Sequence, residues 1–149
     1  MNKPFLLLTS ICWTFSSLSL LTKAEQVVIS EIMYHPKDGG HEFVEIENLT
    51  STPFDIALWR LSGGVDFEFP DFSTASPRNT FLKAFEKILI CDTDPGTFRA
   101  AYGLPSAVRV FGPWEGNLNN GGERINLKDK NGINRCTVRY DNQGNWPVA

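Results

Sequence analysis

The stretch HEFVEIEN, residues 41–48, decides the fold because its apolar and acidic residues alternate. Val44 and Ile46 are separated by Glu45 and followed by Glu47. Successive side chains of a β-strand point to opposite faces of the sheet, so the apolar pair and the acidic pair face opposite ways. The pattern predicts a strand with one buried and one hydrated face, and favours this over a carboxylate cluster for metal or acid–base chemistry.

Two further glutamates lie close to this strand. Glu42 is at the entrance of the strand and does not converge with the glutamates that follow it. Glu31 belongs to a second predicted strand, VVISEIMY at 27–34, in which both faces look apolar. We therefore expect Glu31 to be partly buried, with a structural partner such as Arg60 or Arg124, in preference to a perturbed acid in a pocket.

Short segments of this kind recur along the chain, with turn residues between them. The segment KILIC, 87–91, is continuously apolar, which predicts a strand covered on both faces. Asp129-Lys130-Asn131-Gly132 predicts a hairpin turn. The other β-like segments are residues 57–64, 65–70, 108–112, 123–129 and 133–140. This spacing predicts an all-β sandwich or barrel.

One short helical insert is expected at residues 94–103. Asp94 can cap a helix, Pro95 fits its first turn and Gly103 can end it. Phe98 and Tyr102 are four residues apart, so they share a face that can dock on the sheet.

Residues 1–24 have the layout of a secretory signal peptide. Lys3 precedes an uncharged stretch, 5–22, and Thr22-Lys23-Ala24 resembles a cleavage site. A membrane anchor is the competing interpretation, but six Ser and Thr residues dilute the apolar stretch. We expect a single exported domain at 25–149, secreted or associated with the cell envelope, with no stable membrane span after cleavage.

The charge of the chain argues against nucleic acid as a partner. All 17 acidic residues and 12 of the 14 basic ones lie beyond residue 24, which gives the expected mature chain a net charge of −5. No run of Lys or Arg occurs, whereas nucleic-acid binding relies on clustered basic residues.

No metal or cofactor site is predicted. Cys91 and Cys136 have no zinc-ligand spacing, and export would permit them to form a disulfide, although two buried thiols are as good an interpretation. His35 and His41 flank Asp38, but solvated loop histidines explain this arrangement more simply than a metal site.

No catalytic residue is predicted either. The chain has no GxSxG, P-loop or HExxH motif, and Cys91 has no evident histidine partner in a catalytic pattern. The alternative is a small carboxylate-dependent hydrolase that uses Glu31, Glu45 and Asp92, which requires two of these carboxyl groups to lie within about 10 Å across a cleft.

A candidate partner-contact site is the loop FGPWEGNLNNGGE, 111–123, which is rich in Gly and Asn. Trp114, Asn117 and Asn119 could contact a carbohydrate or protein partner there. The alternative is that Trp114 packs across the end of the sandwich. Trp59 alternates with Arg60 and is assigned to the core.

The order of these segments resembles the lamin tail domain of secreted bacterial proteins. VVISEIMYHP, HEFVEIEN, FDIALWRLSGG, KILICDTDPGTFRAAYG and NRCTVRYDNQGNWP carry the resemblance, which runs from Val27 to Pro147. It implies an immunoglobulin-like β-sandwich of Greek-key type without established catalytic residues. It also implies that the recurrent positions of the family are structural determinants: Glu31, Glu45, Asn48, Trp59, Gly122 and Trp146.

The expected function is a secreted, non-catalytic binding or adhesion module that contacts a protein, a carbohydrate or the cell envelope. The alternative is the N-terminal piece of a larger exported hydrolase, or the small hydrolase described above. In the family the Trp-Pro pair near the end is followed by a turn and another strand, whereas this chain stops at Ala149. We therefore expect either a fragment of a longer protein or a sandwich with one unpaired edge.

Overall fold

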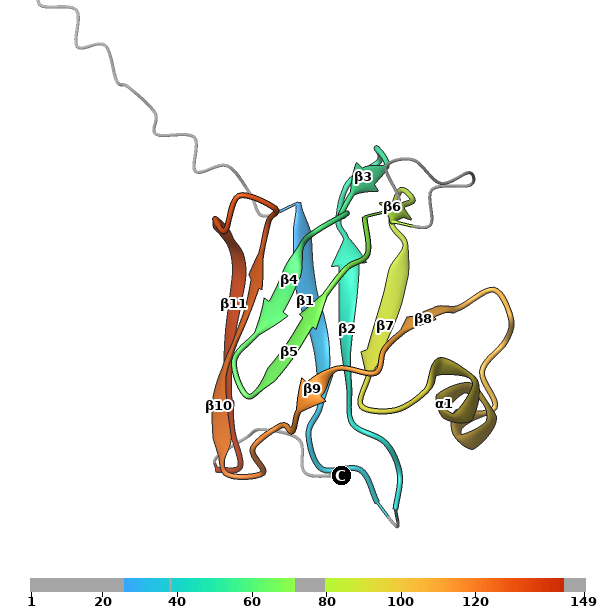
Figure 1. Cartoon of the computed structure of the whole chain (residues 1–149), viewed down its shortest axis with the longest axis vertical. Coiled ribbons are helices and arrows are strands. Elements are labelled where there is room, and N and C mark those ends of the chain that lie inside the picture. The colour runs from blue at the N-terminus through green and yellow to red at the C-terminus, as the bar shows by residue number, and fades with distance from the viewer. Residues whose placement is uncertain (1–25, 38, 72–79, 144–149) are drawn as a thin grey trace, which may run out of the picture.

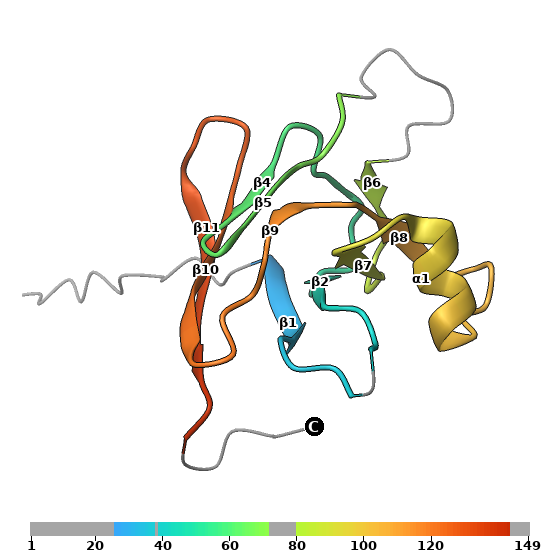
Figure 2. The same ribbon diagram turned by 60° about the horizontal axis from the view of Figure 1, so that its bottom comes forward.

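The computed structural model describes residues 26–37, 39–71 and 80–143. The expected signal peptide, Asp38 and Trp146 lie outside these residues. Two β-sheets face each other as layers, and a short helix lies against β7 and β8, outside the space between them (Figures 1 and 2). This arrangement confirms the predicted immunoglobulin-like β-sandwich.

The elements are as follows. The four-stranded sheet has the order β1 (Val27–Met33), β2 (Phe43–Asn48), β7 (Lys87–Cys91) and β8 (Arg109–Phe111). The five-stranded sheet has the order β11 (Asn134–Asp141), β10 (Gly122–Lys128), β4 (Arg60–Ser62), β5 (Val65–Glu68) and β9 (Glu115–Gly116). A small pair is formed by β3 (Phe54–Asp55) and β6 (Phe81–Leu82), and the helix is α1 (Pro95–Tyr102).

The alternation predicted for residues 41–48 is confirmed in β2. Val44 and Ile46 are fully buried in the main core, while Glu45 and Glu47 are partly exposed on the outer face. Lys87 Nζ, on the neighbouring strand β7, lies 2.6 Å from Glu45 Oε1 and 3.7 Å from Glu47 Oε2. The outer acidic row is therefore partly neutralised by a lysine from the adjacent strand.

The expectation that Glu31 is partly buried was wrong. A β-bulge shifts the register of β1 against β2 between Ile29 and Glu31, so that Ile29 faces Ile46 but Glu31 faces Glu45. The extra residue of a bulge reverses which face each following side chain takes. Glu31 is consequently exposed, and Ile32 packs against the core instead.

The helix and the strand before it follow the prediction. Asp94 caps α1 by accepting hydrogen bonds from the amides of Gly96 and Thr97, and Gly103 ends the helix in a left-handed conformation. Phe98 is buried beneath α1 with the outward residues of β7, while the inward residues of β7 join the main core. The helix returns the chain in its original direction, so β7 and β8 pair in parallel.

Both described cysteines are free thiols in separate parts of the interior. Cys136 lies in the main core, where its Sγ is 3.4 Å from the amide of Ile29. Cys91 lies in the second apolar cluster beneath α1. The alternative of two buried thiols therefore holds, and the disulfide does not form.

Candidate functional site

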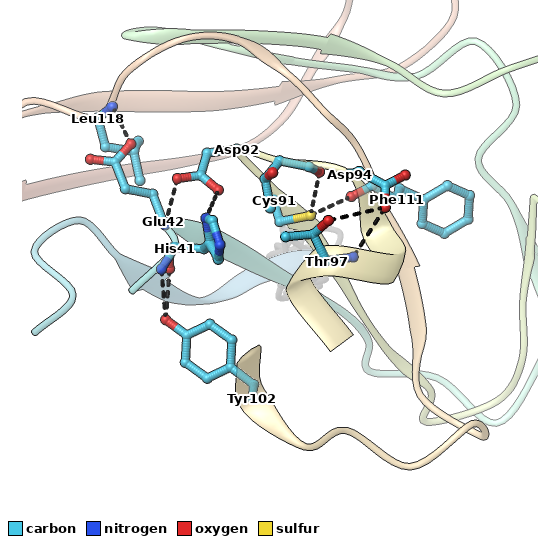
Figure 3. A network of polar contacts seen from close by, with 10 residues as sticks. His41, Glu42, Cys91, Asp92, Asp94, Thr97, Tyr102, Phe111 and Leu118 are labelled. Carbon is cyan, nitrogen blue, oxygen red and sulfur yellow. Dashed lines mark hydrogen bonds and ion pairs between the residues drawn. The ribbon is translucent and has the colours of Figure 1, made fainter. Parts of the chain in front are cut away.

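A network of polar contacts lies at one end of the sandwich, where the β1–β2 connection, the end of β7 and the β9–β10 loop meet (Figure 3). Glu42 donates its amide to Asp92 Oδ2 at 3.0 Å, and its Oε2 accepts the amide of Leu118 at 2.9 Å. His41 Nδ1 lies 3.0 Å from Asp92 Oδ1. We call this network, with Glu123 and Tyr140 beside it, the polar end.

Tyr102 links α1 to the polar end through hydrogen bonds. Its hydroxyl donates to the carbonyl oxygen of His41 at 2.8 Å and accepts the amide of the same residue at 3.2 Å (Figure 3). The ring of Phe43 meets those of Phe98 and Tyr102 edge to face. The helix is thus held by both apolar and polar contacts, which gives these side chains a structural role.

The carboxyl group of Glu42 has a pKa raised above its usual value. Burial is the main cause, and the nearby negative charges of Asp92 and Glu123 raise the pKa further. The hydrogen bond from the Leu118 amide acts in the opposite direction. The ionised form of Glu42 is therefore less favourable in the folded protein than in the unfolded chain.

Replacing Glu42 with Gln tests this electrostatic cost. Gln keeps an oxygen for the Leu118 amide but carries no charge, so Glu42→Gln is expected to be more stable than wild type at neutral pH. The folded pKa is raised, so the difference should shrink as the pH falls and vanish below the ordinary glutamate pKa of 4.5, where wild-type Glu42 is itself protonated. Urea unfolding at a series of pH values measures the difference, and a variant less stable at neutral pH would contradict it.

The polar end contains no activated thiol. Cys91 Sγ donates to the carbonyl oxygens of Thr93 at 3.1 Å and Phe111 at 3.3 Å. Burial raises the pKa of the Cys91 thiol from 9.0 to about 11, and the carboxylates of Asp92 and Asp94 contribute in the same direction. A nucleophilic cysteine needs the opposite shift, because only the thiolate attacks.

We expect the native chain to resist thiol reagents. In a Cys12→Ser variant, Cys91 and Cys136 are the remaining cysteines. Near pH 8, the raised pKa lowers the thiolate fraction of Cys91 about a hundredfold relative to a thiol of pKa 9.0. Modification by an aromatic disulfide reagent should be slow until urea is added. Since the folded pKa is raised, the stability gained from the neutral thiol should be lost as the pH rises from 9.0 to about 11.

The predicted partner-contact residues do not form one exposed site. Trp114 is only 5 % exposed and belongs to the main core, so its assignment as a partner contact was wrong and the packing alternative is correct. Asn117 is exposed. Asn119 is exposed too, but its amide donates to Glu123 Oε1 and its side chain accepts the amide of Gly121. Trp114 packs into the main core at the end of the sandwich, although its neighbours in the sequence include several Gly and Asn residues.

The three carboxylates of the hydrolase alternative lie in two separate places. Glu31 and Glu45 face each other across β1 and β2, where the Ser30 hydroxyl donates to Glu45 Oε1 at 2.8 Å. Asp92 is bound within the polar end by His41 and Glu42. A site that used all three carboxylates would have to extend from the outer face of the sheet, where Glu31 and Glu45 lie, to the polar end, where Asp92 lies.

Three of the predicted structural determinants occupy constrained positions in the fold. Trp59 is buried in the main core. Asn48 is fully buried and bonded on both ends of its amide. Gly122 has a φ of +100° at the start of β10. Trp146 lies outside the described residues, so its role remains a prediction.

Within residues 26–37, 39–71 and 80–143, no three His, Cys, Asp or Glu side chains are grouped to hold a metal ion. Of the three residues considered above as metal ligands, Asp38 lies outside these ranges. His41 Nδ1 lies 3.0 Å from Asp92 Oδ1. The same part of the chain has no helix long and apolar enough to span a bilayer.

Exposed hydrophobic side chains at the opposite end of the sandwich were not predicted from the sequence. Five exposed side chains belong to turns and short strands there, and we call this end of the sandwich the apolar end: Leu49, Leu58, Phe81, Phe85 and Ile133. They come from turns and short strands, where the period-two pattern does not apply. The available signal was an apolar residue next to turn residues, as at Ile133 after Gly132.

These features define an all-β, immunoglobulin-like domain whose described polar groups largely stabilise the fold. The lamin tail domain model matches residues 22–142, more than half of the 149 residues. The chain therefore belongs to the lamin tail domain family, as the order of segments indicated. No curated protein matches the chain.

Proposed function

We propose that this chain is a secreted, non-catalytic binding module that contacts a protein, a carbohydrate or another component of the cell envelope. The contrast between its two ends carries the proposal. At the polar end, the charged side chains are bound to backbone amides and to one another, as in the contacts of Glu42 and Asp92. At the apolar end, hydrophobic side chains are exposed, as expected of a binding surface.

The sequence of the N-terminus supports the exported location in this proposal. The N-terminal 24 residues have the pattern of a signal peptide, and both described cysteines are buried thiols that an oxidising compartment would not readily pair. A domain of this family with no motif for catalysis is best suited to attachment.

The experiment combines localisation with capture. The full chain is expressed in a bacterial export host, and the processed protein is recovered and incubated with envelope fractions and with chromogenic ester, phosphoester and glycoside substrates. We expect retention on an envelope fraction and no turnover. Turnover that is abolished by Glu45→Gln or Asp92→Asn, with the fold intact, would overturn the proposal in favour of the hydrolase alternative.

A further inference from the structure

The outer face of the five-stranded sheet carries two pairs of opposed cations. Arg124 on β10 lies directly opposite Arg139 on β11, and Lys128 on β10 lies opposite Arg60 on β4. The residues between the cations of β10 are buried in the main core, so the cations themselves point outward. Like charges directly opposite one another destabilise a sheet, so both pairs reduce the stability of the fold.

Three of these four cations have no partner among the described residues. Arg60 is bound by Asp66, whose Oδ1 lies 2.6 Å from Arg60 Nε. Within the described part of the chain, the side chains of Arg124, Arg139 and Lys128 form neither an ion pair nor a hydrogen bond. Their charges are therefore available to an anion from outside.

The outward acidic side chains of the same sheet lie mainly on its other half. They are Asp66 and Glu68 on β5 and Glu115 on β9. The strand order places β4 between these residues and β10. Asp141, at the end of β11, is the exception, and Arg135 is bound to Asp129. The unpaired positive charge is therefore confined to a narrow track along β10 and β11, because an anion over β5 and β9 would be repelled.

A row of neutral polar side chains lies between the two pairs of cations. Ser62, Asn126 and Thr137 lie side by side across β4, β10 and β11. Thr137 Oγ1 donates to Asn126 Oδ1 at 3.0 Å. Within the described residues, the Ser62 hydroxyl and Asn126 Nδ2 make no hydrogen bond, so they can bind the hydroxyl groups of a ligand. We call Arg124, Arg139 and Lys128, together with this row, the basic strip.

A shallow cavity of about 420 Å³ lies at one end of the basic strip, lined by Arg124, Arg139 and the glycine pair 121–122. Two carboxylates, those of Glu123 and Asp141, also line it. Glu123 accepts a backbone amide and a tyrosine hydroxyl, and Asp141 accepts a backbone amide. The guanidinium groups have no such contacts, and their fork of N–H donors matches a carboxylate.

The basic strip is open to an extended ligand. Arg124 and Arg139 are exposed and Lys128 is partly exposed. The helix α1 lies at the opposite side of the molecule, against β7 and β8 (Figures 1 and 2). Arg124 and Lys128 are four residues apart on one strand, which separates them by about 13 Å. A ligand that meets both must therefore be extended and carry more than one anionic group.

We propose that the basic strip binds an acidic polysaccharide that lies along β10 and β11. Arg124 and Arg139 hold one carboxylate and Lys128 another, while the polar row between them binds sugar hydroxyl groups. Nucleic acid fits less well, because its binding relies on neutralising many phosphates and the strip has only three unpaired cations. This inference rests on the proposed function and narrows its partner to an anionic carbohydrate.

The test uses the full chain, recovered from the export host, in affinity electrophoresis through gels that contain polygalacturonate, neutral dextran or single-stranded DNA. Mobility is compared with that in a gel without polymer. Polygalacturonate should retard the protein, less strongly at high salt, and dextran should not. Arg124→Gln and Arg139→Gln should each weaken the affinity about fivefold, since each removes one exposed ionic contact.

Two controls separate binding from charge and folding. Lys83→Gln removes one exposed positive charge outside the strip and should bind polygalacturonate as wild type does. Arg124→Gln and Arg139→Gln should keep or raise the urea midpoint, because each relieves the repulsion between the opposed guanidinium groups. Weaker binding without loss of stability indicates that the arginine pair serves a ligand.

Four results would overturn the inference. The first is a wild-type protein that polygalacturonate does not retard, and the second is retardation that both arginine variants leave unchanged. The third is a lower urea midpoint in both arginine variants, which would make the pair structural. The fourth is equal or tighter binding to single-stranded DNA that the same variants weaken. Retention on an envelope fraction without retardation by polygalacturonate would remove the acidic polysaccharide and leave the proposed function intact.

Discussion

Asn48→Asp is expected to destabilise the folded protein by about 4 kcal/mol, a large share of the stability of a domain of this size. Asn48 Nδ2 donates to the carbonyl oxygens of Thr52 and Lys83, both at 2.8 Å, and of Leu82 at 3.4 Å. Its Oδ1 accepts the amide and the hydroxyl of Thr50. One fully buried side chain therefore joins the turn after β2 to the segment before β7.

The Asp substitution keeps the acceptor and removes the donors. A carboxylate would face three carbonyl oxygens without water, whereas Ala only leaves them unpaired, so Asn48→Ala should cost about 3 kcal/mol. The Asp variant should recover part of its stability in acid, because a protonated carboxyl group can donate one hydrogen bond. Urea unfolding followed by tryptophan fluorescence measures all three proteins.

The control for this change is Asn117→Asp, the same substitution at an exposed loop position. We expect an effect within about 0.5 kcal/mol there. An Asn48→Asp protein as stable as this control would show that the Asn48 amide does not hold the two turns together.

The buried amide also explains why the sequon Asn48-Leu49-Thr50 should stay unmodified in the folded domain, since its nitrogen is inaccessible.

Gly122→Ala is the second change with a large expected effect, about 3 kcal/mol or more. Gly122 starts β10 at a φ of +100°, which an alanine rarely adopts. A Cβ at this position would lie 2.5 Å from Tyr140 O and 2.5 Å from Asp141 Cα on the paired strand β11. Both atoms belong to the backbone, so relief requires the two strands to separate.

Gly132→Ala separates the two contributions. Gly132 has a φ of +76° in the β10–β11 turn, but a Cβ there meets no atom within 4 Å. This variant should lose about 1 kcal/mol from backbone strain alone, and the excess loss in Gly122→Ala measures the steric clash. Equal unfolding midpoints for the two variants would show that β10 and β11 adjust without cost. Thermal unfolding monitored by circular dichroism provides the comparison.

Sequence patterns were reliable where each residue acts within its own strand or turn. The alternation in β2, the continuous apolar run of β7 and the capped helix α1 were all confirmed. These patterns failed where a bulge adds one residue to a strand, and where segments distant in the sequence cover a side chain. The bulge at Ser30 moved Glu31 to the outer face, and the sandwich end buried Trp114 although its neighbours are Gly and Asn.

The two ends of the domain also illustrate the difference between what the sequence predicts and what the fold decides. The sequence contains the exposed hydrophobic residues and the acidic ones, but Leu49, Phe85 and Ile133 are separated by dozens of positions and carry no shared motif. Only the pairing of strands brings their turns to one end and Glu42, with Asp92, to the other.

The sequence by itself determined the family, the all-β class and the faces of the longer strands, because local periodicity and turn residues suffice for these features. The tertiary structure alone decided which turns meet, which carboxylates are bound and which hydrophobic side chains remain exposed. Those outcomes depend on strand register and packing between residues far apart in the chain, and a shift of one residue reverses the face that a side chain takes.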